Sequence, residues 1–301
     1  MRKILQETFL EMIRRAATDL PPDVEGAIRR ASKAEERGST AAGALGILLE
    51  NVAMARAESR PMCQDTGTNT WWIHHPVDVT AGTVKAAVLW ATRRAVRLGY
   101  LRPNAVDSVT GENSGDNTGV GQPVIHLEQR ARAGMAVDVL LKGGGCENVS
   151  GQAALPDFSI GAGRDLDGVR KAVLKIVDFA QGRGCAPGVI GVCVGGDRVT
   201  GYELAKQQLL RPLTDRSPDR VLARLERTLL KESNELEIGP MGFGGKTTIL
   251  AVKAVKAHRL PASFFVTVSY SCWSLRRAHV RIARGKPTFS DTSFLLKAGG
   301  R

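Results

Sequence analysis

The chain has 301 residues, of which 43% are hydrophobic and 24% are charged, as in an ordinary soluble globular protein with a sizeable core. No apolar run approaches the length of a membrane span, which argues against a membrane protein. The formal net charge of +12 would suit nucleic acid, but the basic residues are spread along helical segments, without an RNA-binding signature or zinc-finger spacing. A nucleic-acid-binding module is therefore the less favoured interpretation, and the charge also suits an acidic ligand or partner subunit.

The N-terminus begins with basic residues but reaches a glutamate at Glu7. This pattern indicates the start of an amphipathic helix and not a secretory signal, so we expect the protein in the cytoplasm.

Apolar residues at three- and four-residue spacing predict helices at about 4–17, from Pro22 onward, and from 41 to about 57. This helical scaffold of about 60 residues precedes an α/β part at 61–301. There, strands are expected at 70–79, 124–127, 136–141, 188–194, 247–257 and 264–270. Helices are expected at 83–98, 167–181 and in two later segments, the second beginning at Ser217-Pro218 with a cap and a first-turn proline. The alternation predicts an α/β fold with mixed sheets, and no boundary between subdomains is visible.

Two glycine-rich segments come close to phosphate-binding motifs without meeting them. Gly242–Thr247 resembles the end of a P-loop, but position 240, where the first glycine is required, holds Pro240. Gly161 and Gly163 are followed by Leu166 where the dinucleotide motif needs a third glycine. A nucleotide-dependent enzyme is therefore not expected.

The five cysteines form no CxxC pair, which argues against structural zinc and ferredoxin-type clusters. In a cytosolic chain they should be reduced. Cys193 lies in the apolar run Val189–Val194 and is expected to be a small buried side chain, whereas the others lie in polar or glycine-containing turns. One of these, Cys146, lies in the predicted flexible loop 142–148, where backbone amides can approach a ligand. A cluster held by three distant cysteines is one alternative that the spacing leaves open.

Several motifs, taken together and in order, resemble those of the class I fumarate hydratases, and most closely the α subunit of the two-subunit fumarase and L-tartrate dehydratase enzymes. They are Cys63-Gln64-Asp65-Thr66-Gly67-Thr68, Asp116-Asn117-Thr118, Lys142-Gly143-Gly144-Gly145, Cys185-Ala186-Pro187 and Ser271-Cys272-Trp273. The resemblance covers nearly the whole chain. It implies a [4Fe-4S] cluster held by Cys63, Cys185 and Cys272, with the fourth iron open to act as a Lewis acid on the substrate. It also implies that Cys146 lies close to the cluster without being a ligand.

The resemblance implies roles for further residues. Gln64 and Asp65 match residues that contact the substrate or the iron-bound hydroxyl, although a turn with a side-chain cap would explain them as well. Arg102 matches an arginine that binds a substrate carboxylate through its planar donor fork, with a plain surface arginine as the competing interpretation.

Two further assignments come from the same resemblance. Gly144 and Gly145 match a loop whose backbone faces the substrate. His258 corresponds to a histidine near the active site, but the segment His258-Arg259-Leu260-Pro261 is slightly longer than the usual form, and a helix-end histidine is the competing interpretation.

The implied function is that of a hydro-lyase α subunit that interconverts fumarate and L-malate. The domain that supplies the catalytic base is then expected on a separate β subunit, so the active enzyme would be a hetero-oligomer acting on a small dicarboxylate. L-tartrate dehydratase is the alternative; Thr68 and the segment Gly244–Thr248 favour fumarate modestly. A non-catalytic iron-sulfur redox sensor is an alternative of a different class.

Overall fold

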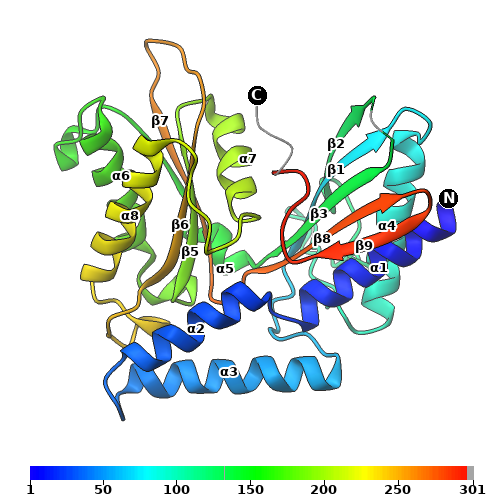
Figure 1. The fold of residues 1–301 in the computed structure, drawn as a ribbon, viewed down its shortest axis with the longest axis horizontal. Coiled ribbons are helices and arrows are strands. Elements are labelled where there is room, and N and C mark those ends of the chain that lie inside the picture. Colours follow the sequence, from blue (N-terminus) through cyan, green and yellow to red (C-terminus); the bar gives the residue numbers. More distant parts are fainter. Residues whose placement is uncertain (132, 297–301) are drawn as a thin grey trace. The chain divides into compact units, whose positions relative to one another are not determined.

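The computed structural model describes residues 1–131 and 133–296, and it divides into two compact units built from separated chain segments (Figure 1). Unit 1 comprises Met1–Pro22, Glu50–Gly144 and the chain from Ser274 onward, and unit 2 comprises Asp23–Leu49 and Gly145–Trp273. The predicted α/β class, with N-terminal helices followed by mixed sheets, is confirmed. In the described residues we find no helix long and apolar enough to cross a membrane.

The first three helices match the predicted helical scaffold. They are α1 (Arg2–Thr18), α2 (Pro22–Ala34) and α3 (Thr40–Glu58). Pro22 occupies the first turn of α2, where its missing N–H is no loss, and Asp23 and Glu25 favour the positive end of the helix dipole. The side chain of Ser39 accepts a hydrogen bond from the backbone N–H of Ala42 at the start of α3.

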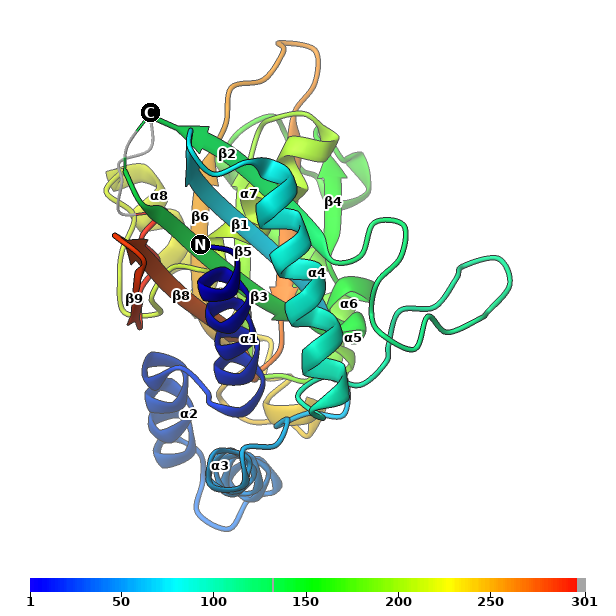
Figure 2. The ribbon, with the colours of Figure 1, turned by 90° about the vertical axis from the view of Figure 1, so that its right-hand side faces the viewer.

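Unit 1 contains a five-stranded mixed sheet in the order β2-β1-β3-β8-β9. Its strands are β1 (Thr68–Pro76), β2 (Val124–Arg130), β3 (Met135–Lys142), β8 (Arg276–Ala283) and β9 (Lys286–Ser290). Only the pairing of β1 with β2 is parallel among these neighbours. Helices α1 and α4 (Ala81–Arg97) cover one face of the sheet (Figure 2), where Phe9, Trp71 and Val88 belong to a fully buried apolar core.

Unit 2 contains a four-stranded sheet in the order β4-β7-β5-β6. Helices α6 and α8 lie on one side of this sheet and α7 on the other (Figure 1). Gly191 of β5 allows α7 to approach, because a Cβ there would lie 1.9 Å from the Ala205 carbonyl oxygen. The strands are β4 (Gly151–Ala154), β5 (Gly188–Val194), β6 (Ile249–Lys256) and β7 (Phe265–Ser271). The helices are α5 (Gly144–Asn148), α6 (Leu166–Ala180), α7 (Arg198–Gln208) and α8 (Arg220–Glu235), with 3-10 turns η1 (Phe158–Ile160), η2 (Gln181–Gly184) and η3 (Pro240–Gly242).

Three features differ from the sequence-based expectation. The cap of α8 is Asp219, whose carboxylate accepts the N–H groups of Val221 and Leu222, and not Ser217. The loop expected at 142–148 contains the short helix α5. Strands β4, β8 and β9 were not predicted, because β4 is short and β8 carries three arginines and a histidine.

Candidate active site

The segment that carries Cys63, Gln64 and Asp65 is fixed at both ends within unit 1. Before it, the N–H of Met62 donates to the carbonyl of Ala17, and the side-chain amide of Asn51 donates to the carbonyl of Met62. After it, Gly67 adopts a left-handed conformation with a φ of 78°, and a Cβ there would lie 2.8 Å from the carbonyl of Lys142. Glycine is therefore required where this segment enters β1 beside the end of β3.

The carboxylate of Asp65 links this segment to the glycine loop after β3. One oxygen accepts the N–H of Gly67 at 3.0 Å, and the other accepts the N–H of Gly144 at 2.7 Å. At Gly143, a Cβ would lie 2.9 Å from the same Asp65 oxygen, so a side chain would displace the carboxylate. The structure thus brings Asp65 and Gly144 together, with Gly144 donating its amide to Asp65, while Gly145 begins the second chain segment of unit 2.

Arg102 lies next to the same segment, with an exposed side chain whose Nη1 donates to the carbonyl of Gln64 at 3.3 Å. Its backbone is held by Asn117, whose side-chain amide donates to the Arg102 carbonyl at 2.6 Å. The Asn117 oxygen accepts the N–H groups of Asn104 and Ala105. Asn117 has a φ of 59°, a conformation that asparagine tolerates better than most residues. Its supporting role was not predicted, although the motif Asp116-Asn117-Thr118 contained the signal.

Two of the three predicted cluster ligands are neighbours within unit 2. Cys185 follows η2 in a left-handed conformation with a φ of 52°, and its carbonyl accepts the N–H of Trp273 at 3.3 Å. The N–H of Cys272 donates to the sulfur of Cys146 at 3.2 Å, so Cys146 lies beside Cys272, near where the resemblance put it. Cys185 is exposed and Cys272 is buried.

The ring of Tyr270 packs beside these cysteines. A Cβ on Gly184 would lie 2.5 Å from this ring and a Cβ on Gly188 would lie 2.4 Å from it, so neither position has room for a side chain. Burial raises the pKa of Tyr270 far above its usual range, and the negative charge of thiolates at Cys146, Cys272 and Cys185 adds to the effect. By contrast, burial alone raises the pKa of Cys193 to about 11, and its side chain is fully buried in β5 as predicted.

His258 is not brought together with Cys185 and Cys272. It is an exposed residue just after β6, which runs parallel to β5, whereas β7 runs antiparallel to β5 and ends at Ser271. His258 and Cys272 therefore lie at opposite ends of the strands of this sheet, about 20 Å apart along the length of β7 at 3.3 Å per residue. Figure 1 shows the loop after β6 at the top of unit 2 and α5, which carries Cys146, well below that loop.

The sulfur donors suit iron, since thiolates are the ligands of iron-sulfur clusters. Across residues 1–131 and 133–296, no three histidine, cysteine, aspartate or glutamate side chains are arranged as a metal-binding group. Cys63 belongs to unit 1, whereas Cys185 and Cys272 belong to unit 2. The donor chemistry fits a cluster, and the convergence of all three thiolates stays a prediction.

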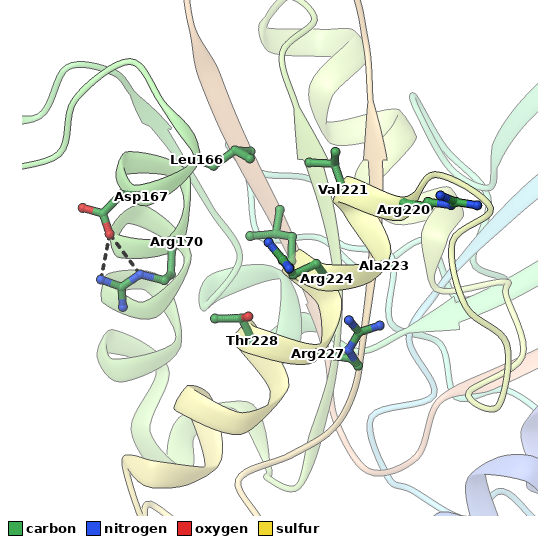
Figure 3. Close-up of a pocket in the computed structure, with 10 residues that line it drawn as sticks. Leu166, Asp167, Arg170, Arg220, Val221, Ala223, Arg224, Arg227 and Thr228 are labelled. Atoms are coloured by element: carbon green, nitrogen blue, oxygen red, sulfur yellow. Dashed lines mark hydrogen bonds and ion pairs between the residues drawn. The ribbon is translucent and has the colours of Figure 1, made fainter.

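A separate hollow of about 760 Å³ lies between α6 and α8 in unit 2 (Figure 3). Arg220, Arg224 and Arg227 of α8 line it, together with Arg170, which donates two hydrogen bonds to Asp167. None of the candidate site residues lines this hollow. Its arginines belong to two amphipathic helices, so the hollow is a surface feature apart from the candidate chemistry.

The sequence pattern of the family described as fumarate hydratase (Fumerase) matches residues 6–281. The chain belongs to this family. It is 48% identical over 281 residues to a Geobacillus stearothermophilus protein provisionally named fumarate hydratase class I, an overlap of 92% of this chain and 55% of that protein. It therefore spans about half the length of that relative.

Shorter relatives match along nearly their whole length. A Methanocaldococcus jannaschii protein provisionally named L(+)-tartrate dehydratase subunit alpha is 31% identical, with 92% of this chain and 97% of that protein covered. The L(+)-tartrate dehydratase subunit alpha of Escherichia coli K12 is 29% identical, with 94% and 91% covered. The resemblance inferred from the motifs is thus confirmed at the level of the family.

Proposed function

We propose that this chain is the α subunit of a [4Fe-4S]-dependent hydro-lyase that reversibly hydrates fumarate to L-malate in the cytoplasm. The observation that carries the proposal is the Asp65 carboxylate fixed by the Gly67 and Gly144 amides, in a chain 48% identical to a class I fumarate hydratase relative. A partly buried carboxylate that two backbone amides hold in a turn is suited to orient a hydroxyl group during its addition or departure.

Cys63, Cys185 and Cys272 are the residues that would hold the cluster. When bound, the cluster supplies a Lewis-acid iron that polarises the substrate hydroxyl and eases its departure. Cys185 lies exposed in its turn, and Cys272 is buried beside Cys146.

The remaining steps in this chain are binding and orientation. Arg102 binds one substrate carboxylate, because its exposed guanidinium lies beside Gln64 and carries the donor fork that carboxylates prefer. Asp65 and Gln64 orient the hydroxyl group that leaves or adds. A β subunit supplies the residue that removes or returns the proton on carbon, so the α subunit alone is catalytically incomplete.

The division of labour is tested by purifying the chain anaerobically with and without a β subunit. We expect hydratase activity only from the complex. Full turnover by the α subunit alone would contradict the proposal.

Cluster binding is tested with Cys185→Ser, and Cys193→Ala serves as the matched control because Cys193 is fully buried in β5. We expect wild type and Cys193→Ala to be brown and oxygen-sensitive, and Cys185→Ser to lose the broad visible absorption and bound iron. Equal iron content in all three proteins would remove Cys185 from the ligand set. A brown complex that hydrates neither acid would favour the redox-sensor alternative.

L-tartrate is the second candidate substrate, since the relatives of matching length carry the name L(+)-tartrate dehydratase subunit alpha. Steady-state rates of the same complex on L-malate and L-tartrate decide between the two. We expect the larger kcat/KM on L-malate, and a larger value on L-tartrate would reassign the substrate.

A further inference from the structure

Arg276, the first residue of β8, is a buried cation. It is 1% exposed and lies opposite Leu141 in the pairing of β8 with β3. Its Nε and Nη1 atoms have no hydrogen-bond partner among the described residues. Because a guanidinium stays protonated in proteins, Arg276 cannot avoid this cost by losing its charge. A buried cation of this kind is expected to have an anion as its partner.

The guanidinium of Arg276 and the carboxylate of Asp65 both lie close to Gly143. Its Nη2 lies 3.7 Å, and the Asp65 Oδ2 lies 2.9 Å, from the position that a Cβ on Gly143 would occupy. The carboxylate of Asp65 accepts the amides of Gly67 and Gly144, and among the described residues it makes no hydrogen bond with the Nε or Nη1 of Arg276. All of these residues belong to unit 1.

We propose that Arg276 binds a carboxylate group of the dicarboxylate substrate beside Gly143. The proposal rests on the proposed function and extends it by adding a second cation to Arg102. The two arginines differ in kind. Arg102 is exposed and donates to the Gln64 carbonyl, whereas Arg276 is buried and two of its donor atoms find no partner within residues 1–131 and 133–296. A dicarboxylate has two anionic ends, and a buried arginine binds one of them with a charge-assisted hydrogen bond.

This assignment has a consequence for stability that a purely structural arginine would not have. The unpaired charge destabilises the ligand-free protein, and a bound carboxylate relieves that cost. Replacing Arg276 with the uncharged Met should therefore leave the melting temperature of the ligand-free protein unchanged or raise it. The same replacement should remove the rise in melting temperature that a bound dicarboxylate causes.

The experiment uses the complex of this chain with its β subunit and the variants Arg276→Met and Arg276→Lys. Arg281→Met is the matched control, because Arg281 is an exposed arginine of the same strand. The readouts are KM for L-malate and fumarate and the rise in melting temperature with succinate, a dicarboxylate that lacks the reacting groups. We expect Arg276→Met to raise KM on the order of 100-fold and to lose the succinate shift, Arg276→Lys to recover part of both, and Arg281→Met to match wild type.

The outcomes separate the two proposals. A normal KM and a retained succinate shift in Arg276→Met would overturn the role of Arg276 while leaving the hydratase function intact. A wild-type complex without turnover would overturn the hydratase function, and the succinate shift would then still test Arg276. If Arg276→Met does not fold, a normal KM and succinate shift in the folded Arg276→Lys would overturn the proposal, since Lys lacks the guanidinium donors.

Discussion

Asp65 is a carboxylate whose two oxygens each accept a backbone amide, from Gly67 and from Gly144. Asn in its place keeps the size of the side chain but turns an NH₂ group toward one of these donors, so the side chain must rotate or lose a hydrogen bond. We therefore expect Asp65→Asn to lower kcat about 100-fold or more, while the complex keeps its iron and colour. Steady-state kinetics with iron analysis provides the measurement.

Asp107→Asn is the matched control for Asp65→Asn. Asp107 also accepts two backbone amides with its carboxylate, from Val109 and Thr110, but it lies on an exposed turn outside the candidate site. We expect its kcat to equal that of wild type. A similar loss of kcat in both variants would mean that Asp65 supports the folded structure and has no specific part in the reaction.

The burial and the role of single residues could be predicted from the sequence to different degrees, because both depend on spatial neighbours that the sequence does not show. Cys193 could be recognised as buried from its apolar run alone. Arg276 was missed, because an arginine pair in Leu275-Arg276-Arg277 is typical of a solvated strand and only the tertiary structure shows that it is buried. The resemblance placed His258 near the active site, whereas the topology of unit 2 puts it at the opposite end of the strands from Cys272, and its role stays a prediction.

The glycine loop between β3 and α5 shows how an element fixes the geometry of the site. A Cβ at Gly143 would lie 2.9 Å from the Asp65 carboxylate oxygen, closer than side chains tolerate. We expect Gly143→Ala to fold, since the φ of Gly143 is not in the left-handed region, but to lower kcat/KM about 100-fold by displacing Asp65. The comparison is Gly119→Ala, where a Cβ would meet nothing within 4 Å. Activity of Gly143→Ala within twofold of Gly119→Ala would show that the close approach is unimportant.

Most elements could be predicted from periodicity, and the failures have local causes. The buried strand β5 was predicted at 188–194 because it is apolar throughout. The start of α8 was placed at Ser217-Pro218, but Asp219 lies closer to the apolar repeat and accepts two amides, which makes it the better cap. Strand β8 was missed because its three arginines and one histidine obscure its alternation with apolar residues, and β9 was missed because it is short and contains Pro287.

The division of the molecule into two units could not be read from the sequence, because no linker separates them. The chain changes unit within the helix α3, between Leu49 and Glu50, where the helical pattern continues without interruption. It changes unit again between Gly144 and Gly145 and between Trp273 and Ser274, directly beside predicted site residues along the chain. The motifs that carry the family resemblance are therefore distributed over both units.

The charge of the whole molecule gives a prediction for its stability in acid. Several carboxyl groups have pKa values below their usual range, chiefly because hydrogen bonds favour their charged form; these are Glu11, Asp107, Glu128, Asp157, Asp167, Asp197 and Asp219. The unfolded chain, with ordinary pKa values near 4, takes up protons first as the pH falls. The stability from these groups is therefore complete above their ordinary pKa and is lost as the pH falls through the lower folded values.

We expect the urea midpoint of the chain to be constant between pH 7 and 6 and to fall steadily below about pH 4.5, as these carboxyl groups take up protons. Protonation also adds to a net charge that is already +12, so repulsion between basic residues increases the loss. Urea titrations at fixed ionic strength provide the measurement, and added salt should reduce the acid loss by screening the repulsion. A urea midpoint that stays constant down to pH 3 would mean that the charged form of these carboxyl groups stabilises the folded chain no more than the protonated form does.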